Sequence, residues 1–224
     1  MDGLYIVNGL RGLVFGHGIR KQVRYLVRRV KEVVANGNDV ILTCLGFSRG
    51  AVTAMLLAKH LGRLPSSVTD HINMNMLLVD PVPGNSRLAA KLDCCNLTIT
   101  NRVIDMRCAA PVLQDVTVLY CAENLPQWNY WYAPIFPCFP DTTTVEEDVV
   151  LGCHAATVKM PTSTESALTF ARITDFLTSH GVTFSARAAV YIDQWKWSRT
   201  LQNRVLNKLV QRCNQEFRML TEVQ

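Results

Sequence analysis

The sequence has no apolar run long enough to cross a membrane. Among its 224 residues the apolar stretches, such as 40–45 and 76–79, are far shorter than the roughly 20 residues that a spanning helix needs. The first residues, MDGLYIVNGLRG, do not contain a basic segment followed by an apolar stretch and a cleavage site. We therefore expect neither a transmembrane segment nor a Sec-type signal.

The sequence also lacks the cysteine spacing of a disulfide framework or a zinc site. Eight cysteines are scattered along the chain, several inside apolar runs, and none forms a CxxC pair. Cys153 and His154 are adjacent, which does not supply the spaced ligand pairs of a zinc site. We expect buried free thiols in a reducing, cytoplasm-like compartment, with no metal and no other cofactor.

Acidic residues are missing from one basic segment. Between Arg20 and Lys31 there are six Lys or Arg residues and no Asp or Glu, although the whole chain has 23 Lys and Arg against 18 Asp and Glu. The apolar residues between them follow helical spacing, which predicts an amphipathic helix with a basic outer face. A solvated face is the simplest interpretation, and attraction to an anionic membrane surface or to phosphate is the sharper one. No aromatic platform or reader motif accompanies the charge, so we expect no nucleic-acid partner.

Apolar segments alternate with turn signals along the chain, without internal repeats. Strands are predicted at residues 4–8, 39–46, 72–79 and 116–122, with a weaker candidate at 97–105. Helices are predicted over the basic segment and at residues 51–60, 163–179 and roughly 186–220. Segment 39–46 is β-branched and apolar throughout, as in a strand buried on both faces of a parallel sheet. The alternation predicts one α/β domain over residues 1–224 with a mainly parallel sheet.

A short polar segment interrupts the apolar run of residues 40–57. The pentapeptide GFSRG (46–50) matches G-x-S-x-G, between a predicted strand and a predicted helix, which is the setting of a nucleophile elbow. A Cβ at position 46 or 50 is expected to collide with the neighbouring strand or helix. The turn would hold Ser48 in strained geometry at the sheet edge, with the backbone N–H of Arg49 as one oxyanion donor.

Two loops complete this predicted site. The glycine-bearing loop NGLRG (8–12) is expected to supply the second oxyanion donor from the backbone of Gly9 or Leu10. Segment 125–148 is rich in aromatics and proline and has no periodicity, which predicts a long functional loop, or else a packed cap. Phe47, Trp128 and Trp131 are the candidate substrate contacts.

A serine nucleophile needs a histidine to accept its proton. After an elbow of this kind the chain order is Ser, acid, His. His154, which follows the long loop, is the favoured base. His60 lies along the elbow helix and His71 precedes the favoured acid. His180 lies at a predicted helix C-terminus, where a structural role is commoner.

The acid should follow a later strand. Asp80 stands directly at the end of strand 72–79 and is locked by prolines, so we favour it. The competing interpretation of Asp80 is turn chemistry, because Asp before Pro is a common strand terminator. Glu123, at the end of strand 116–122, is the competing acid.

These segments resemble the α/β-hydrolase family with a GFSRGA elbow, which includes bacterial type VI secretion lipase effectors. The similarity runs through FGHGIRKQVRYLVRRVKEVVANGNDVILTCLGFSRGA (15–51), LLVDPV, LYCAEN followed by IFP, and LGCHAA. It implies an α/β-hydrolase-like fold with a long C-terminal helix and a triad of Ser48, Asp80 and His154. It also implies a short, secreted-effector-like version that acts inside a target cell.

Two functions remain open from the sequence. The first is a serine esterase of phospholipase or lipase type, which acts through an acyl-enzyme on a lipid or other acyl ester. The second is a catalytically silent scaffold of the same fold, an effector that binds a host protein or lipid.

Overall fold

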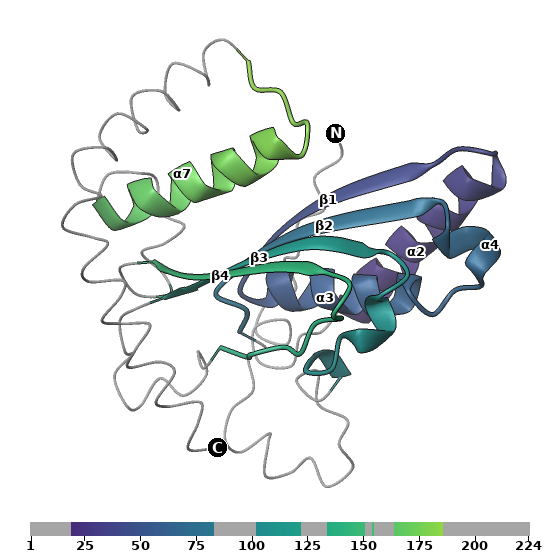
Figure 1. Ribbon diagram of the computed structural model, residues 1–224, viewed down its shortest axis with the longest axis horizontal. Helices are drawn as coiled ribbons and strands as arrows, with labels where there is room; N and C mark the ends of the chain where they lie inside the picture. The colour runs from purple at the N-terminus through teal and green to yellow at the C-terminus, as the bar shows by residue number, and fades with distance from the viewer. Residues whose placement is uncertain (1–18, 83–101, 122–133, 151–153, 155–163, 186–224) are drawn as a thin grey trace, which may run out of the picture. The chain divides into compact units, whose positions relative to one another are not determined.

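The computed structural model describes residues 19–82, 102–121, 134–150, 154 and 164–185. The elements in chain order are α2 (Ile19–Ala35), β1 (Val40–Phe47), α3 (Arg49–Leu61), α4 (Ser66–Thr69), β2 (Ile72–Val79), η1 (Arg107–Ala109), β3 (Leu113–Cys121), β4 (Thr144–Val150) and α7 (Thr164–Ser179) (Figure 1). The four strands form one sheet in the order β1-β2-β3-β4, and β1 and β2 are parallel. The predicted α/β class with a mainly parallel sheet is confirmed.

The chain divides into two compact units. The first comprises residues 1–116 and 125–146, and the second comprises 117–124 and 147–224, so β3 and β4 each pass from the first unit into the second. In the second unit, the guanidinium of Arg172 in α7 pairs with the carboxylate of Asp148 in β4 at 2.9 Å. The single domain over residues 1–224 stays a prediction.

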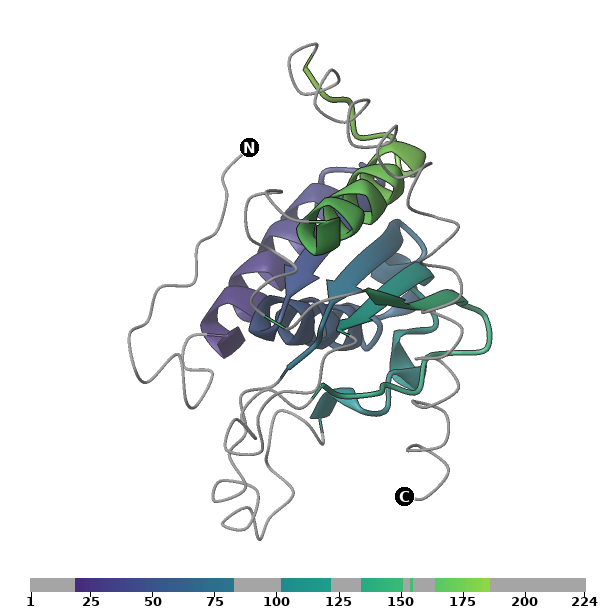
Figure 2. The same ribbon diagram turned by 90° about the vertical axis from the view of Figure 1, so that its left-hand side faces the viewer.

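The predicted basic helix is confirmed as α2. Ile19, Val23 and Val30 are buried, which is the spacing of one helix face. Figure 2 shows α2 alongside α3, which packs against both β1 and β2. Gly37 has a φ of 78°, a left-handed conformation that glycine adopts without strain, and it turns the chain toward β1. Within the first unit, α2 lies against α3 and also contacts β1.

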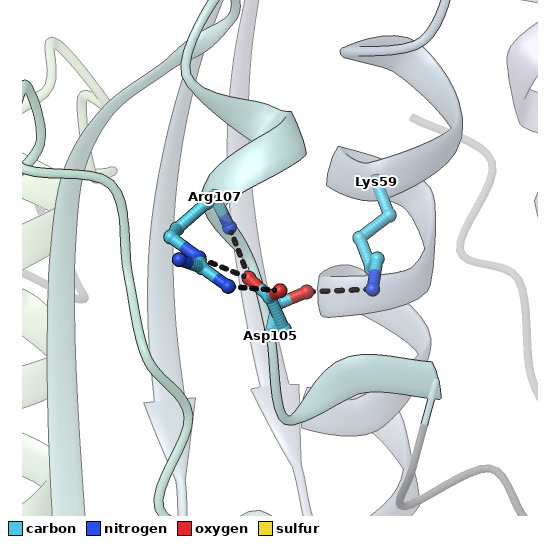
Figure 3. Close-up of polar contacts among 3 residues, drawn as sticks. All are labelled: Lys59, Asp105 and Arg107. Carbon is cyan, nitrogen blue, oxygen red and sulfur yellow. Dashed lines mark hydrogen bonds and ion pairs between the residues drawn. The ribbon is translucent and has the colours of Figure 1, made fainter. Parts of the chain in front are cut away.

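The far end of α3 is fastened to η1 by a buried lysine. Lys59 is 8% exposed, and its Nζ donates a hydrogen bond of 2.6 Å to the backbone carbonyl of Asp105 (Figure 3). The guanidinium of Arg107 donates to both carboxylate oxygens of Asp105, at 3.0 and 2.8 Å. These hydrogen bonds from Arg107 hold the pKa of Asp105 well below its usual range. A Cβ on Gly62 would lie 2.7 Å from the Cα of Ala109, so the backbones of the two elements touch here.

The prediction that the first strand is buried on both faces is wrong. Ile41 is 72% exposed and Leu45 is 49% exposed. Side chains alternate along a strand, and Gly46 of β1 lies against Ala51 of α3, so Ile41 and Leu45 belong to the other face. β1 is also the first of the described strands in the sheet order, so β2 is its one neighbour among them.

The end of the predicted long loop is also different, because residues 144–148 belong to β4. The first four residues of β4 are exposed, so no apolar alternation marks the strand in the sequence. Tyr120 of β3 donates a hydrogen bond of 3.1 Å to Glu147 of β4, a link that depends on tertiary pairing. The aromatic part of this segment, residues 125–133, lies outside the described residues.

The remaining predicted elements have mixed outcomes. The helices at 51–60 and 163–179 and the strand at 72–79 are confirmed as α3, α7 and β2, and β3 begins three residues before its prediction. In the candidate strand at 97–105, residues 102 and 103 are helical, and Asp105 makes only an isolated bridge to Cys138. The strand prediction is therefore wrong for residues 102–105. Segments 4–8, 97–101 and 186–220 lie outside the described residues.

No helix in the described part of the chain combines the length and the apolar character needed to cross a bilayer.

Candidate active site

The GFSRG segment forms a tight turn between β1 and α3. β1 ends at Phe47 and α3 begins at Arg49, so Ser48 alone makes the turn, with φ of 55° and ψ of −120°. This conformation is rare for residues other than glycine and costs about 1–3 kcal/mol unless the surroundings enforce it. The Ser48 N–H donates to the carbonyl of Val79 at 2.9 Å, and its carbonyl accepts from the N–H of Ala51 at 3.1 Å. The backbone of Ser48 is thus held by β2 on one side and by α3 on the other.

The two glycines of the pentapeptide play different parts. A Cβ on Gly46 would lie 2.5 Å from the backbone N and Cα of Ala51, so the close approach of β1 and α3 requires glycine, as predicted. The same prediction is wrong for Gly50, where a Cβ would meet no atom of the described strands and helices within 4 Å. Gly50 is the second residue of α3.

Asp80 lies next to Ser48 at the same edge of the sheet. The parallel register pairs Phe47 with Val79, so Ser48 and Asp80 each follow the last paired residue of strands that lie about 4.8 Å apart. Asp80 is 3% exposed and has a φ of 43°. Its successor Pro81 accepts a hydrogen bond of 2.9 Å from the N–H of Ile135, which fastens the chain after the turn.

Backbone strain is concentrated at this edge. Among the described residues, Ser48 and Asp80 are the two non-glycine residues with positive φ. Strain of this kind gathers at functional sites, where the surrounding structure enforces a conformation that local preference opposes. The sequence placed both residues at strand ends, but it contained no signal for the left-handed conformation of Asp80.

His154 belongs to the second unit. It follows the end of β4 by four residues and is 7% exposed. Its role as the base for Ser48 stays a prediction.

The other described histidines lie in or beside helices and strands away from the Ser48 turn. His60 lies in the last turn of α3, about 18 Å along the helix from Ser48. Its pKa is lowered mainly by desolvation, and then by nearby cations such as Arg63. His71 precedes β2, and its Nδ1 lies 2.7 Å from Oδ1 of Asp39. His180 follows α7, and its Nδ1 lies 2.8 Å from the carbonyl of Phe176.

The remaining predicted site residues are only partly described. Phe47 is half-buried at the end of β1, and Arg49 is the first residue of α3, where helix N–H groups lack intrahelical acceptors. Gly9, Leu10, Glu123, Trp128 and Trp131 lie outside the described residues. Their roles in the site stay predictions.

The described cysteines differ in exposure. Cys44, Cys108 and Cys121 are half-buried and Cys138 is exposed, so the prediction of buried thiols is wrong for Cys138. Within the described residues no group of three or more His, Cys, Asp or Glu side chains is arranged to hold a metal ion.

The chain is similar to one characterised esterase. It is 27% identical over 149 residues to Esterase PE16 of Mycobacterium tuberculosis (strain ATCC 25618 / H37Rv), a match that covers 65% of this chain and 26% of that protein. The chain therefore matches about a quarter of the length of this relative. No protein-family model matches the chain. No solved structure matches it.

Proposed function

We propose that the protein is a serine hydrolase that cleaves carboxylic esters. The observation that carries the proposal is the pair of Ser48 and Asp80, both with positive φ, at the ends of adjacent parallel strands. A G-x-S-x-G turn of this shape is the elbow that exposes a serine nucleophile at a sheet edge. The similarity to Esterase PE16 supports an ester as the substrate class.

In the proposed mechanism, the Ser48 hydroxyl attacks the ester carbonyl and gives its proton to His154. The backbone N–H of Arg49, with a donor from Gly9 or Leu10, stabilises the oxyanion. His154 then returns the proton to the leaving alcohol, and an acyl group remains on Ser48. Water attacks this acyl-enzyme by the same route, which releases the carboxylic acid and restores Ser48.

Asp80 is the proposed partner of the histidine. A buried carboxylate can orient the imidazole and stabilise it when it becomes charged. Burial of Asp80 to 3% exposure and its fixed position beside Ser48 support this role. Glu123 remains the alternative acid.

We place the substrate among lipid esters, of the phospholipase or lipase type. Phe47 lies directly before Ser48 and offers an aromatic wall, and Trp128 and Trp131 are the proposed further contacts. Trp is enriched at membrane–water interfaces, where a lipid ester would be met. We place its action in a target cell, as an effector, on the resemblance of its motifs alone.

A fluorophosphonate probe tests the nucleophile. It should label the full-length protein and should not label Ser48→Ala, because the probe needs an activated hydroxyl. Ser67→Ala, an exposed serine of α4, is the matched control and should label like the wild type. Labelling that persists in Ser48→Ala, or none in folded wild-type protein, would overturn the proposal and favour the silent scaffold.

The acid is identified by comparing two variants on a water-soluble acyl ester. Asp80→Asn should lower kcat by about 10⁴-fold, the size of effect seen when a triad acid loses its charge. Glu123→Gln should leave kcat within severalfold of the wild type. The reverse result would assign the acid to Glu123, and circular dichroism of both variants checks that they are folded.

A further inference from the structure

The outward face of α2 carries an unusual concentration of cations. Its six basic residues are all exposed; this set, the basic face, is Arg20, Lys21, Arg24, Arg28, Arg29 and Lys31. Arg20, Arg24 and Arg28 recur every four residues, so they form a row along one side of the helix. The opposite side is buried in the first unit, so the basic face is turned away from the core.

Only one end of the basic face is neutralised. Arg29 and Arg28 lie 2.6 and 3.9 Å from the carboxylate of Glu32. Among the described residues, no carboxylate forms an ion pair with Arg20, Lys21 or Arg24. The first two turns of α2 therefore hold three cations that the described part of the fold leaves without a counter-charge.

The placement of these charges opposes the helix dipole. The start of a helix favours anions and its end favours cations. α2 has no acid in its first turn and no basic residue in its last turn, where Glu32 and apolar residues stand instead. A sequence that breaks this local rule without a compensating contact among the described residues points to a functional constraint.

The cationic end of α2 lies toward the proposed nucleophile. Residues 36–39 join the end of α2 to the start of β1, so the helix and the strand run in opposite directions. Both are about 26 Å long, from 17 helical and 8 extended residues. α2 contacts both α3 and β1, and it runs opposite to β1, so its first turns lie toward the edge of the sheet where Ser48 follows β1.

We propose that the basic face of α2 docks the protein on an anionic lipid bilayer and brings the Ser48 edge of the sheet to the membrane. The lipid phosphates supply the counter-charges that Arg20, Lys21 and Arg24 lack within the described fold. Tyr25 lies beside the row, is 43% exposed and has the Arg28 guanidinium 5.6 Å from its ring centre. A tyrosine among cations suits the headgroup region of a membrane. This inference rests on the proposed function in one respect, that the membrane supplies the ester substrate. The docking itself does not depend on hydrolysis.

Vesicle sedimentation tests the docking separately from hydrolysis. Full-length Ser48→Ala protein is mixed with phosphatidylcholine vesicles, with or without phosphatidylserine. We expect it to bind the anionic vesicles, and to bind them less at high salt. Each cation near the surface strengthens binding about fivefold, so Arg20→Gln/Lys21→Gln/Arg24→Gln should weaken it about 100-fold.

Matched variants separate charge from position. Arg20→Lys/Arg24→Lys keeps the charge and should bind like the parent protein. Arg63→Gln removes one exposed cation outside α2 and should bind more tightly than Arg24→Gln.

Three results would overturn the docking proposal: equal binding to neutral vesicles, unchanged binding of the triple variant, or binding of duplex DNA in place of anionic vesicles. Labelling of the wild type by the fluorophosphonate probe in vesicle-free solution reports on the proposed function alone. A protein that the probe labels but that does not bind vesicles would support the proposed hydrolase and contradict the proposed docking surface.

Discussion

Replacing the two glycines that flank the Ser48 turn should have opposite effects on stability. Gly46→Ala should destabilise the fold by about 1–3 kcal/mol or more, because the added Cβ would overlap the backbone of Ala51 at 2.5 Å and push α3 away from β1. Gly50→Ala should stabilise the fold by about 0.5–1 kcal/mol, because its Cβ meets none of the described residues and alanine is the better helix former.

Urea unfolding of the two variants measures the difference, and fluorophosphonate labelling shows whether the elbow survives. Gly50→Ala should still label, since the backbone of Ser48 is held by Val79 and Ala51 whatever stands at position 50. Equal destabilisation by both substitutions would contradict the distinction between the two glycines.

At the scale of elements, α3 is held at both of its ends. Its start is fixed by the strained turn at Ser48. Its far end is fixed by Lys59, whose Nζ donates a hydrogen bond to the backbone carbonyl of Asp105, two residues before η1. Lys59→Met keeps the apolar stem but leaves that carbonyl without its donor, so it should cost about 1–3 kcal/mol of the free energy of unfolding.

The comparison for Lys59→Met is Arg107→Gln, which removes the exposed guanidinium from Asp105. We expect a much smaller change in the urea midpoint, because exposed ion pairs contribute little to stability. A larger effect of Arg107→Gln than of Lys59→Met would contradict the view that the Lys59 hydrogen bond is the main polar link between α3 and the segment before η1.

Elements with apolar periodicity were predictable from the sequence, and those set by tertiary pairing were not. β2 and α2 have continuous apolar patterns bounded by turn residues, and both occur as expected. β4 begins with four exposed residues, so nothing in its local pattern separates it from a loop. The exposure of Ile41 depends on what packs on that face of β1, which the local sequence does not encode.

The candidate site divides in the same way. Ser48 and Asp80 were predictable as neighbours, because each directly follows a strand and parallel strands end at one edge. The positive φ of Asp80 was not predictable, since the chain around it is held by contacts with distant residues such as the Ile135 N–H.

For the molecule as a whole, the half-buried thiol of Cys44 in β1 sets an alkaline limit on stability. Burial raises the pKa of Cys44 from 9.0 to about 11. Between these values the unfolded chain loses the proton and the folded chain keeps it, so stability falls as the pH rises. The contribution is fully present below the unfolded pKa. A pKa difference of about two corresponds to a loss of about 3 kcal/mol by the upper end of this window.

Urea unfolding across this alkaline window measures the effect. The free energy of unfolding of the wild type should fall more steeply with pH than that of Cys44→Ala, even though the variant starts lower because it leaves a cavity. Cys138→Ala removes an exposed thiol and should keep the wild-type slope, so it controls for thiol loss in general. Parallel slopes for the wild type and Cys44→Ala would mean that Cys44 ionises as easily in the folded chain as in the unfolded one. β1 would then have to admit water beneath the turn that carries Ser48.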